Sequence, residues 1–508
     1  MRVDESGGLL LGLDAGNTVI KAVLFDVGGR QLAASERNGV SSRPAPGHVE
    51  RDMAELWTNA AAVIGDCLDR AGVSPGAVAA VGCAGHGNGL YLLDRGGAPI
   101  LAIQSLDSRA EAMAEALRDG GNGARLHRLC LQEPWPSQTP TLLAWLKAEA
   151  PELYAAAGTA FHCKDYITFR LTGRRTADVS DMSGAGLLRL PDGRYDDDLL
   201  AAYGLADAAP LLPDLLWPTE IAGRVTAEAA ALTGLAEGTP VAAGLFDVVA
   251  NALGSGVVEE GQASIIAGTW SINQVVTRRP VVDPGIFMAS AFDAERAVAI
   301  ESSATSAANL EWYVRELVAG TGQGEAAFDA CCRRAAAVVP AADDPFFHPF
   351  LYGSRQGPGM RAGFYGVAGW HRESHLLRAL FEGVAFEHRR HVDVLRGAGI
   401  RFERASLSGG GARSEIWPQM FADMLGIPVS IPVCAEAGAL GAAIAAGVAV
   451  GAFPGLGEAV RAMTAERAHF SPAPGMTDFY DARYRTYRLL TEAMKPVWES
   501  MAAAHARP

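Results

Sequence analysis

The 508-residue chain lacks the features that mark membrane, secreted and disulfide-stabilised proteins. Its longest weakly apolar run, Ala439 to Phe453, is rich in alanine and glycine and is too short to cross a bilayer. The first residues, MRVDESGG, are acidic where a signal peptide would be basic. Seven cysteines form no CxxC pair, which favours reduced thiols over disulfides or zinc ligands. We therefore expect a cytoplasmic protein with no membrane partner.

Positive charge is also scarce. The chain has 43 Lys and Arg against 57 Asp and Glu, a net charge of −14, and no long basic run, which argues against nucleic acid as a partner. It contains neither a P-loop nor a Rossmann glycine fingerprint, so any nucleotide site must use another architecture. With 49% hydrophobic and 20% charged residues, the chain has the balance of a globular protein large enough for more than one core.

Two parts of the chain begin with the same pattern of strand, small-residue turn and strand, within residues 9–25 and 263–277. Each predicts a β-hairpin. The pair indicates an internal duplication with a cleft between the copies, although one such pair also arises by chance. The break at Gly254 to Gly256 then divides the chain into domains at residues 1–253 and 254–508.

Helices and strands are expected to alternate between these landmarks. Helical spacing after Asp52 predicts a helix that stops at Gly72 and Pro75, and Val78 to Cys83 predicts the next strand. A last amphipathic helix is expected from about Asp478 to Met501. The alternation predicts an α/β protein with mixed sheets.

The turn of the first hairpin carries residues suited to phosphate and cation binding. Asp14 ends an apolar strand, where its carboxylate needs a cation, hydrogen-bond donors or water. Gly16, Asn17 and Thr18 can direct backbone N–H groups at a phosphate, and Lys21 adds positive charge. The alternative is an ordinary Asx-type turn with a surface lysine.

The second half offers two further turns of small residues, Gly268-Thr269 and Gly409-Gly410-Gly411. Glycines permit close approach of the backbone to a flat or anionic ligand, but they also occur as plain structural punctuation. Asp247 follows a predicted strand and precedes a predicted helix. It is either a helix cap or a general base that accepts the proton of a substrate hydroxyl during phosphoryl transfer.

Two loops of the first half could bind a polyol. The glycines around His86 and Asn88 predict that both side chains are exposed on a loop. Asp107 and Arg109 either form a local ion pair or flank a sugar site. Several other polar or reactive residues are interpreted as structural: His162, Lys164, Asp165, Cys331 and Cys332.

Taken together and in order, segments along the chain closely resemble the FGGY carbohydrate kinases. The segments are GLDAGNTVIKAVLFD, GHVERDMAELW, AGHGNGLYLLD, SLDSR, KDYITFRLTG, GLFDVVANALGSG, AGTWS, SGGGARSEIWPQMFADMLGIPV and EAGALGAA. The resemblance covers about residues 9 to 495. Within the family it is most similar to the xylulokinases, especially the L-xylulose kinase branch.

The resemblance implies two ribonuclease-H-like domains of the actin and hexokinase superfamily, with a cleft between them, sugar bound mainly by the first and ATP mainly by the second. It implies that Asp247 is the catalytic base and that Asp14 binds Mg²⁺ directly or through water. Asn17, Thr18 and Thr269 match phosphate-facing positions, and His86 matches a sugar-contacting one. The adenosine turn is matched by a further set: Gly409, Gly410, Gly411 and Ala412, with Ser414 and Gln419 beside the base.

Two positions depart from the family pattern. Leu142 stands where a lysine is expected three residues before Trp145, and Leu380 replaces a smaller or β-branched residue.

From the resemblance as a whole we expect an ATP-dependent, Mg²⁺-requiring kinase of a primary hydroxyl of a ketopentose, with the exact sugar open. The alternatives are a kinase of a small alditol such as erythritol, ribitol or xylitol, and an actin-like nucleotide switch. The oligomeric state stays open between monomer and homodimer.

Overall fold

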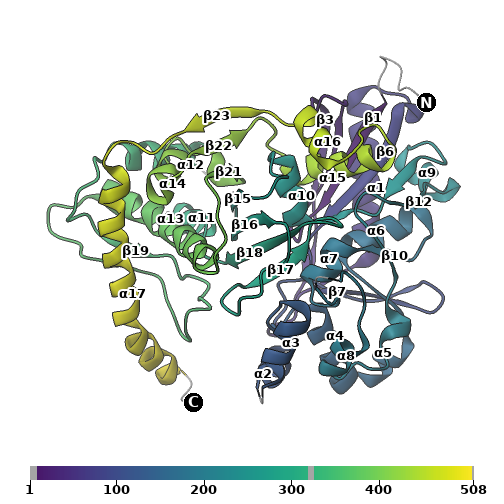
Figure 1. The fold of residues 1–508 in the computed structure, drawn as a ribbon, viewed down its shortest axis with the longest axis horizontal. Helices are drawn as coiled ribbons and strands as arrows, with labels where there is room; N and C mark the ends of the chain where they lie inside the picture. Colours follow the sequence, from purple (N-terminus) through teal and green to yellow (C-terminus); the bar gives the residue numbers. More distant parts are fainter. Residues whose placement is uncertain (1–7, 120, 191, 319–324, 506–508) are drawn as a thin grey trace. The chain divides into compact units, whose positions relative to one another are not determined.

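The computed structural model describes residues 8–119, 121–190, 192–318 and 325–505. Strands and helices alternate along these ranges, as expected for an α/β protein (Figure 1). The chain forms two compact units, which are described separately. The first comprises Met1–Glu260, Val276–Ala299 and Glu436–Ala465, and the second comprises Gly261–Val275, Ile300–Ala435 and Glu466–Pro508. Near the predicted boundary at residues 253 and 254 the chain leaves the first unit, but two later segments return to it.

The first unit is built on a sheet with the strand order β12-β13-β6-β1-β2-β3, and β14 also pairs with β6. β1 is antiparallel to β2 and parallel to β6, so the first predicted hairpin is confirmed. The strands are β1 (Leu9–Ala15), β2 (Val19–Phe25), β3 (Gln31–Asn38), β6 (Val78–Gly85), β12 (Ile221–Arg224), β13 (Pro240–Ala242) and β14 (Leu245–Phe246).

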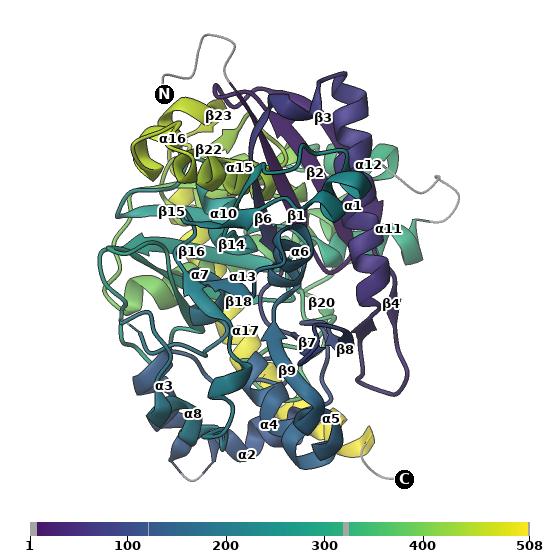
Figure 2. The ribbon, with the colours of Figure 1, turned by 90° about the vertical axis from the view of Figure 1, so that its right-hand side faces the viewer.

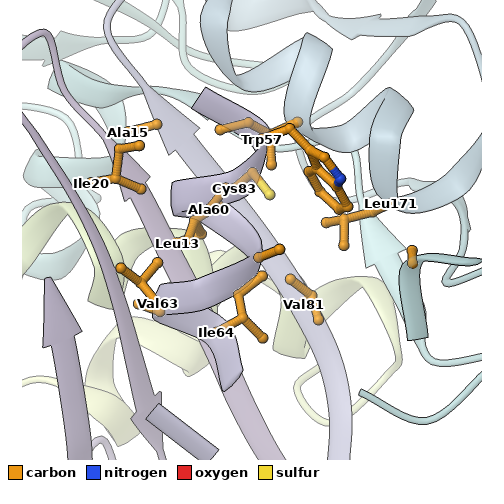
Figure 3. Packing of buried hydrophobic residues seen from close by; sticks show 14 of the residues in the cluster. Leu13, Ala15, Ile20, Trp57, Ala60, Val63, Ile64, Val81, Cys83 and Leu171 are labelled. Atoms are coloured by element: carbon orange, nitrogen blue, oxygen red, sulfur yellow. The ribbon is translucent and has the colours of Figure 1, made fainter. Parts of the chain in front are cut away.

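Helix α1 (Met53–Ala71) packs on this sheet, beside β2 and β3 (Figure 2). Its limits are those predicted, because Asp52 accepts hydrogen bonds from two N–H groups of the first turn and Gly72 ends the helix with φ of 63°. Its apolar face meets strand side chains in a continuous core (Figure 3). That core includes Leu13, Ala15, Ile20, Trp57, Ala60, Val63, Ile64, Val81, Cys83 and Leu171.

Helix α15 (Ala437–Ala449) lies directly on β1 and β6, far from them in sequence. A Cβ at Gly12 would lie 1.9 Å from the Ala439 carbonyl oxygen, and one at Gly82 would lie 2.0 Å from that of Ala442. Only glycine permits this approach. α15 also packs on α10 (Asp247–Gly254), which explains why residues 436–465 belong to the first unit.

A smaller sheet, β4-β5-β8-β7-β9, and several helices complete the first unit. The strands are β4 (Ser41–Ser42), β5 (Glu50–Arg51), β7 (Leu90–Asp94), β8 (Pro99–Ile103) and β9 (Ala157–Phe161). The helices are α2 (Glu111–Arg118), α3 (Asn122–Cys130), α4 (Thr139–Glu149), α5 (Pro151–Ala156), α6 (Cys163–Thr172), α7 (Val179–Gly184), α8 (Asp197–Ala202), α9 (Ala227–Thr233) and α16 (Leu456–Met463). Short pieces are β10 (Thr176–Asp178), β11 (Asp214–Leu216) and β17 (Met288–Ala291).

The second unit repeats the arrangement of the first hairpin. β15 (Gln262–Ala267) is antiparallel to β16 (Ser271–Thr277) and parallel to β21 (Arg404–Ser408), so the second predicted hairpin is confirmed. The sheet continues through β22 (Val429–Pro432) and β23 (Glu466–Phe470), and includes β18 (Ala297–Ser303). The helices are α11 (Ala308–Leu317), α12 (Glu325–Ala336), α13 (Glu373–Gly397), α14 (Trp417–Leu425) and α17 (Met476–His505), beside the short strands β19 (Phe346–His348) and β20 (Gly363–Tyr365).

All seven cysteines are free thiols, and every one except Cys434 is buried. Among the helices that the structure describes, none is long and apolar enough to cross a membrane.

Candidate active site

Two carboxylates lie at one edge of the main sheet of the first unit. In the strand register Ala84 of β6 is opposite Asp14 of β1 on one side and Leu245 of β14 on the other. Asp247 directly follows β14, two residues after Leu245, at the first position of α10. Because the strands are parallel, their carboxyl ends bring Asp14 and Asp247 to the same edge. The N-cap of α10 is Phe246, so the capping role considered for Asp247 is not what the structure shows.

The carboxyl groups of both residues have pKa values above that of an ordinary aspartate. Burial, reinforced by the charge of Glu436, raises the pKa of Asp14 to about 6, against an opposing effect of Lys21. Burial and the neighbouring charges of Asp14 and Asp181 raise the pKa of Asp247 well above its ordinary value. A pair of carboxyl groups with raised pKa values is typical of a site that handles protons or binds a cation.

The turn after Asp14 is fixed by neighbouring segments. The Asn17 amide donates to the Ser105 hydroxyl at 2.8 Å, and the Arg51 guanidinium donates to the Gly16 carbonyl at 3.1 Å. Thr18 is exposed. Lys21 lies 3.0 Å from both Glu36 and Glu436, so its ammonium group is paired within the protein.

His86 and Asn88 are buried, with 3% and 2% exposure, so the prediction of exposed side chains is wrong. Their burial results from segments far away in the sequence, which the loop glycines did not reveal. His86 contacts the Tyr91 hydroxyl at 3.0 Å through Nε2, and burial together with the Arg51 charge lowers its pKa to about 4. Asn88 has a left-handed φ of 61°, and its side-chain oxygen is buried with no hydrogen-bond partner in the described part of the chain. Such an oxygen needs a ligand donor or water.

Asp107 and Arg109 form an ion pair, which is one of the two alternatives that the sequence left open. The guanidinium contacts Asp107 at 2.9 Å and Glu50 at 2.7 Å, and it lies over the Trp145 ring. The Val49 N–H donates to the Asp107 carboxylate at 2.6 Å. These contacts join the loop after β8 to β5, so both charges are already satisfied within the protein.

In the second unit, the two small-residue turns lie side by side. A Cβ at Gly409 would lie 3.0 Å from the Ala267 carbonyl oxygen and 3.2 Å from the Gly268 nitrogen, and Gly409 has φ of 81°. The Gly268 carbonyl accepts a hydrogen bond of 2.9 Å from Ala307. Thr269 is exposed at the tip of its turn. The sequence places these turns about 140 residues apart, and the parallel pairing of β15 with β21 brings them together.

A pocket of about 360 Å³ opens beside the second of these turns. It contains Gly410 and Ser414 from the predicted adenosine turn and Cys332 from the pair interpreted as structural. Gln419 does not line it and instead donates to Asp423 at 2.8 Å. Sequence reasoning missed the remaining lining residues, which come mainly from α11 and α12: Ala307, Leu310, Glu311, Phe328, Asp329, Arg413 and Trp417.

A buried hydrogen-bond network of neutral side chains lies next to the Gly268-Thr269 turn. Asn273 donates to His391 Nδ1 at 2.9 Å and accepts from His388 Nδ1 at 3.0 Å. Ser271 contacts the same nitrogen of His391 at 2.9 Å, and Ser306 contacts His388 Nε2 at 3.1 Å. Burial lowers the pKa of His388 to about 3, so this network carries no charge near neutral pH.

The chain matches known proteins along its length. The N-terminal domain model of the FGGY family of carbohydrate kinases matches residues 9–254, and its C-terminal domain model matches residues 263–450. The L-xylulose/3-keto-L-gulonate kinase of Escherichia coli (strain K12) is 36% identical over 489 residues, which cover 96% of this chain and 97% of that protein. The erythritol kinase of Brucella abortus (strain 2308) is 28% identical over 526 residues, covering 98% and 99%.

A solved structure agrees with these matches. The xylulose kinase from Rhodospirillum rubrum has a TM-score of 0.84 and 28% sequence identity, and the match covers 97% of this chain and 100% of that one. The two-domain α/β fold is therefore confirmed. Both domains of the family are present and a carbohydrate kinase is 36% identical along nearly the whole chain, so this chain is a carbohydrate kinase and belongs to the FGGY family.

Proposed function

We propose that this carbohydrate kinase transfers the γ-phosphoryl group of ATP to a primary hydroxyl of a ketopentose of the xylulose type, with Asp247 as the general base. The observation that carries this proposal is the position of Asp247 beside Asp14 at the carboxyl edge of β1, β6 and β14. A base needs a pKa near the working pH, and burial moves the pKa of Asp247 upward in that direction.

In the proposed mechanism the chain's own groups position the hydroxyl and accept its proton. The ionised carboxylate of Asp247 accepts that proton as the sugar oxygen attacks the phosphorus. The free side-chain oxygen of Asn88 is available to accept a hydrogen bond from another hydroxyl of the sugar. Sugar binding is therefore assigned to the loop 86–89 of the first unit.

The residues around Asp14 fit a magnesium ion. The pKa of Asp14 is raised to about 6 mainly by burial and by the charge of Glu436, and a cation beside it would relieve both effects. Carboxylate oxygens with water are the ligands that Mg²⁺ prefers. Asp14 would therefore hold the ion, which when bound neutralises phosphate charge.

The pocket of the second unit fits the adenosine part of ATP. Its volume of about 360 Å³ lies in the range of ligand sites, about 300–1,000 Å³. Leu310, Phe328 and Trp417 supply apolar surface for a flat base, and Ser414 and Asp329 supply polar atoms. Gly409 to Gly411 and Ala412 form the adjoining turn, and Thr269 presents an exposed hydroxyl for phosphate.

The sugar is proposed from the relatives. The Escherichia coli relative is an L-xylulose/3-keto-L-gulonate kinase, and the Brucella abortus relative is an erythritol kinase. The higher identity of the first favours a ketose. A small alditol is the second candidate, favoured by the nearly complete coverage of the second relative.

The test is coupled ADP release with Mg-ATP against D- and L-ketopentoses, 3-keto-L-gulonate and small alditols. We expect one ketose to raise turnover by at least about a hundredfold over the sugar-free rate. Selective stimulation by erythritol, ribitol or xylitol would instead establish the alditol alternative. An unchanged rate with every compound would contradict both candidates.

ATP and Mg²⁺ are abundant in the cytoplasm, which is therefore the proposed location of the enzyme.

A further inference from the structure

The first unit buries a group of ionisable side chains beneath the loop 86–89. Their side chains are inaccessible to solvent, and they comprise His162, Lys164, Asp165, Asp178 and Asp181. His162, Asp165 and Asp181 have ligand types that could bind a metal ion. Lys164 Nζ, however, lies 2.5 Å from both Asp165 and Asp178 and 3.2 Å from Asp181. Its ammonium group supplies the positive charge that these carboxylates need.

A chain of contacts leads from this cluster to the loop. The Thr139 hydroxyl donates to the Gly89 carbonyl at 2.9 Å and lies 2.9 Å from His162 Nε2. A hydroxyl has one proton and a carbonyl can only accept, so His162 Nε2–H must donate to Thr139. His162 Nδ1 lies 3.3 Å from an oxygen of Asp181, an electrostatic contact without hydrogen-bond geometry in the described part of the chain.

The carboxylates near His162 favour its protonated form. Burial opposes its protonation, but the carboxylates of Asp181 and Asp165 outweigh burial and raise the pKa of His162 above its ordinary value. The hydrogen bond from His162 Nε2–H occupies the Thr139 oxygen as acceptor, so the single proton of the Thr139 hydroxyl is directed at the Gly89 carbonyl.

The loop needs such support because its backbone is strained. Asn88 has φ of 61° and Gly89 has φ of 75°, and Asn88 and Leu131 are the only non-glycine residues with positive φ in the described ranges. Asparagine tolerates this conformation at some cost, so neighbouring groups must fix it. The Gly89 N–H donates to the Ser137 carbonyl at 2.8 Å, and the Gly89 carbonyl accepts from Thr139. The segment 137–139 thus fixes both polar groups of Gly89.

We propose that Asp181, His162 and Thr139 act as positioning residues that hold Gly89, and through it Asn88, so that the free Asn88 carboxamide oxygen meets a sugar hydroxyl. Asp181 also lies close to the other end of the loop, since a Cβ added at Gly87 would be 2.8 Å from its Oδ1. The inference rests on the proposed function, since it takes the loop 86–89 as part of the sugar site.

The first test compares Thr139→Val, which keeps the shape and removes the hydroxyl, with Thr139→Ser, which keeps the hydroxyl. We expect Thr139→Val to raise the KM for the sugar on the order of tenfold, with kcat and the KM for ATP within about twofold. Thr139→Ser should restore the sugar KM. Thr233→Val is the control and should match wild type, because it removes a buried hydroxyl that bonds Ala229 and Leu235 in its own helix region. Equal sugar KM values for Thr139→Val and Thr139→Ser would overturn the proposal.

A double-mutant cycle asks whether Thr139 acts through Asn88. Adding Thr139→Val to Asn88→Ala should leave the sugar KM unchanged, because the group being positioned is already gone. Additive losses would overturn the proposal.

Amide hydrogen exchange of the peptide 86–91 supplies a readout that needs no activity. We expect faster exchange in Thr139→Val and wild-type exchange in Thr139→Ser. If the wild type phosphorylates no sugar, the proposed function is wrong. If amide exchange is unchanged in Thr139→Val, the positioning proposal is wrong, whichever substrate the enzyme phosphorylates.

Discussion

The hairpin β1–β2 of the first unit and the hairpin β15–β16 of the second have the same topology and opposite chemistry. Each first strand is antiparallel to its partner and parallel to a later strand, β6 or β21. β1 ends at the carboxylate of Asp14, whereas β15 is followed by Gly268 and the exposed hydroxyl of Thr269. The repeated backbone thus provides a similar sheet edge in each unit. Under the proposed function, the carboxylate at the first edge binds a cation and the hydroxyl at the second binds phosphate.

The buried polar groups behind the two hairpins differ in the same sense. The first unit buries the charged cluster of Lys164 and its carboxylates, and the second buries the neutral network of Asn273, His388 and His391. Charged groups in a low dielectric influence nearby ionisable groups strongly, whereas a neutral network mainly fixes geometry. The second unit also buries charged groups elsewhere, in the ion pairs of Glu382 with Arg378 and Arg483, so only the polar groups next to the hairpins differ in this way.

The largest expected effect is that of removing the base. Asp247→Asn should lower kcat by about 10²–10⁴-fold, the usual contribution of a general base, while the KM for ATP changes little. Steady-state kinetics with the preferred sugar measure this. Asp69→Asn, which alters an exposed carboxylate, is the matched control and should keep wild-type kcat. A kcat for Asp247→Asn within tenfold of wild type would contradict the base assignment.

The next largest effect is a change in the Mg²⁺ requirement, which we expect for a substitution at the first hairpin and not at the second. Asp14→Asn should raise the Mg²⁺ concentration needed for half-maximal rate by about 10–100-fold, because an amide binds the ion more weakly than a carboxylate. A magnesium titration at fixed ATP checks this. An unchanged Mg²⁺ requirement would remove Asp14 from the proposed metal site.

A smaller effect is expected at the second hairpin. Thr269→Val should reduce kcat/KM for ATP by about tenfold through the loss of one phosphate-binding hydroxyl, with the Mg²⁺ requirement unchanged. Thr269→Ser is the matched variant and should retain most of the activity. If Thr269→Val shifted the Mg²⁺ requirement as Asp14→Asn does, the contrast between the hairpins would be lost.

The smallest effect concerns stability and pH. The folded protein holds the proton of Asp247 more tightly than the unfolded chain does, so ionisation of Asp247 costs stability as pH rises above about 4. Without metal, Asp247→Asn should therefore raise the melting temperature of the protein near pH 8. The gain should vanish below about pH 4, where both residues are neutral. Thermal denaturation at several pH values measures it, and an equal difference at all pH values would contradict the raised pKa.

The parts of the fold that were predicted from the sequence depend on local signals. Apolar runs interrupted by small residues located both hairpins, and Asp52 and Gly72 located the ends of α1. The placement of Asp14 and Asp247 at strand ends followed from the same reasoning. Each of these features needs only a short stretch of chain, so its physical cause is visible in that stretch.

The missed features depend on contacts between distant segments. Asn88 is buried because residues 137–139 lie against its loop, and the pocket of the second unit is completed by α11 and α12. The structural interpretation of Lys164 is not contradicted, but nothing in its own segment shows that Asp178 and Asp181 surround it. Such contacts are set by packing of the whole unit, which spacing along the chain does not specify.

The most direct test of the account measures sugar phosphate formation and sugar binding in parallel, by ³¹P NMR and by calorimetry, for wild type and Asp247→Asn. We predict that wild type forms a phosphomonoester of one ketose in the presence of Mg-ATP, and that Asp247→Asn still binds that ketose but forms almost no product. Product formation by Asp247→Asn at the wild-type rate, or the absence of any sugar phosphate from the wild type, would contradict the central claim.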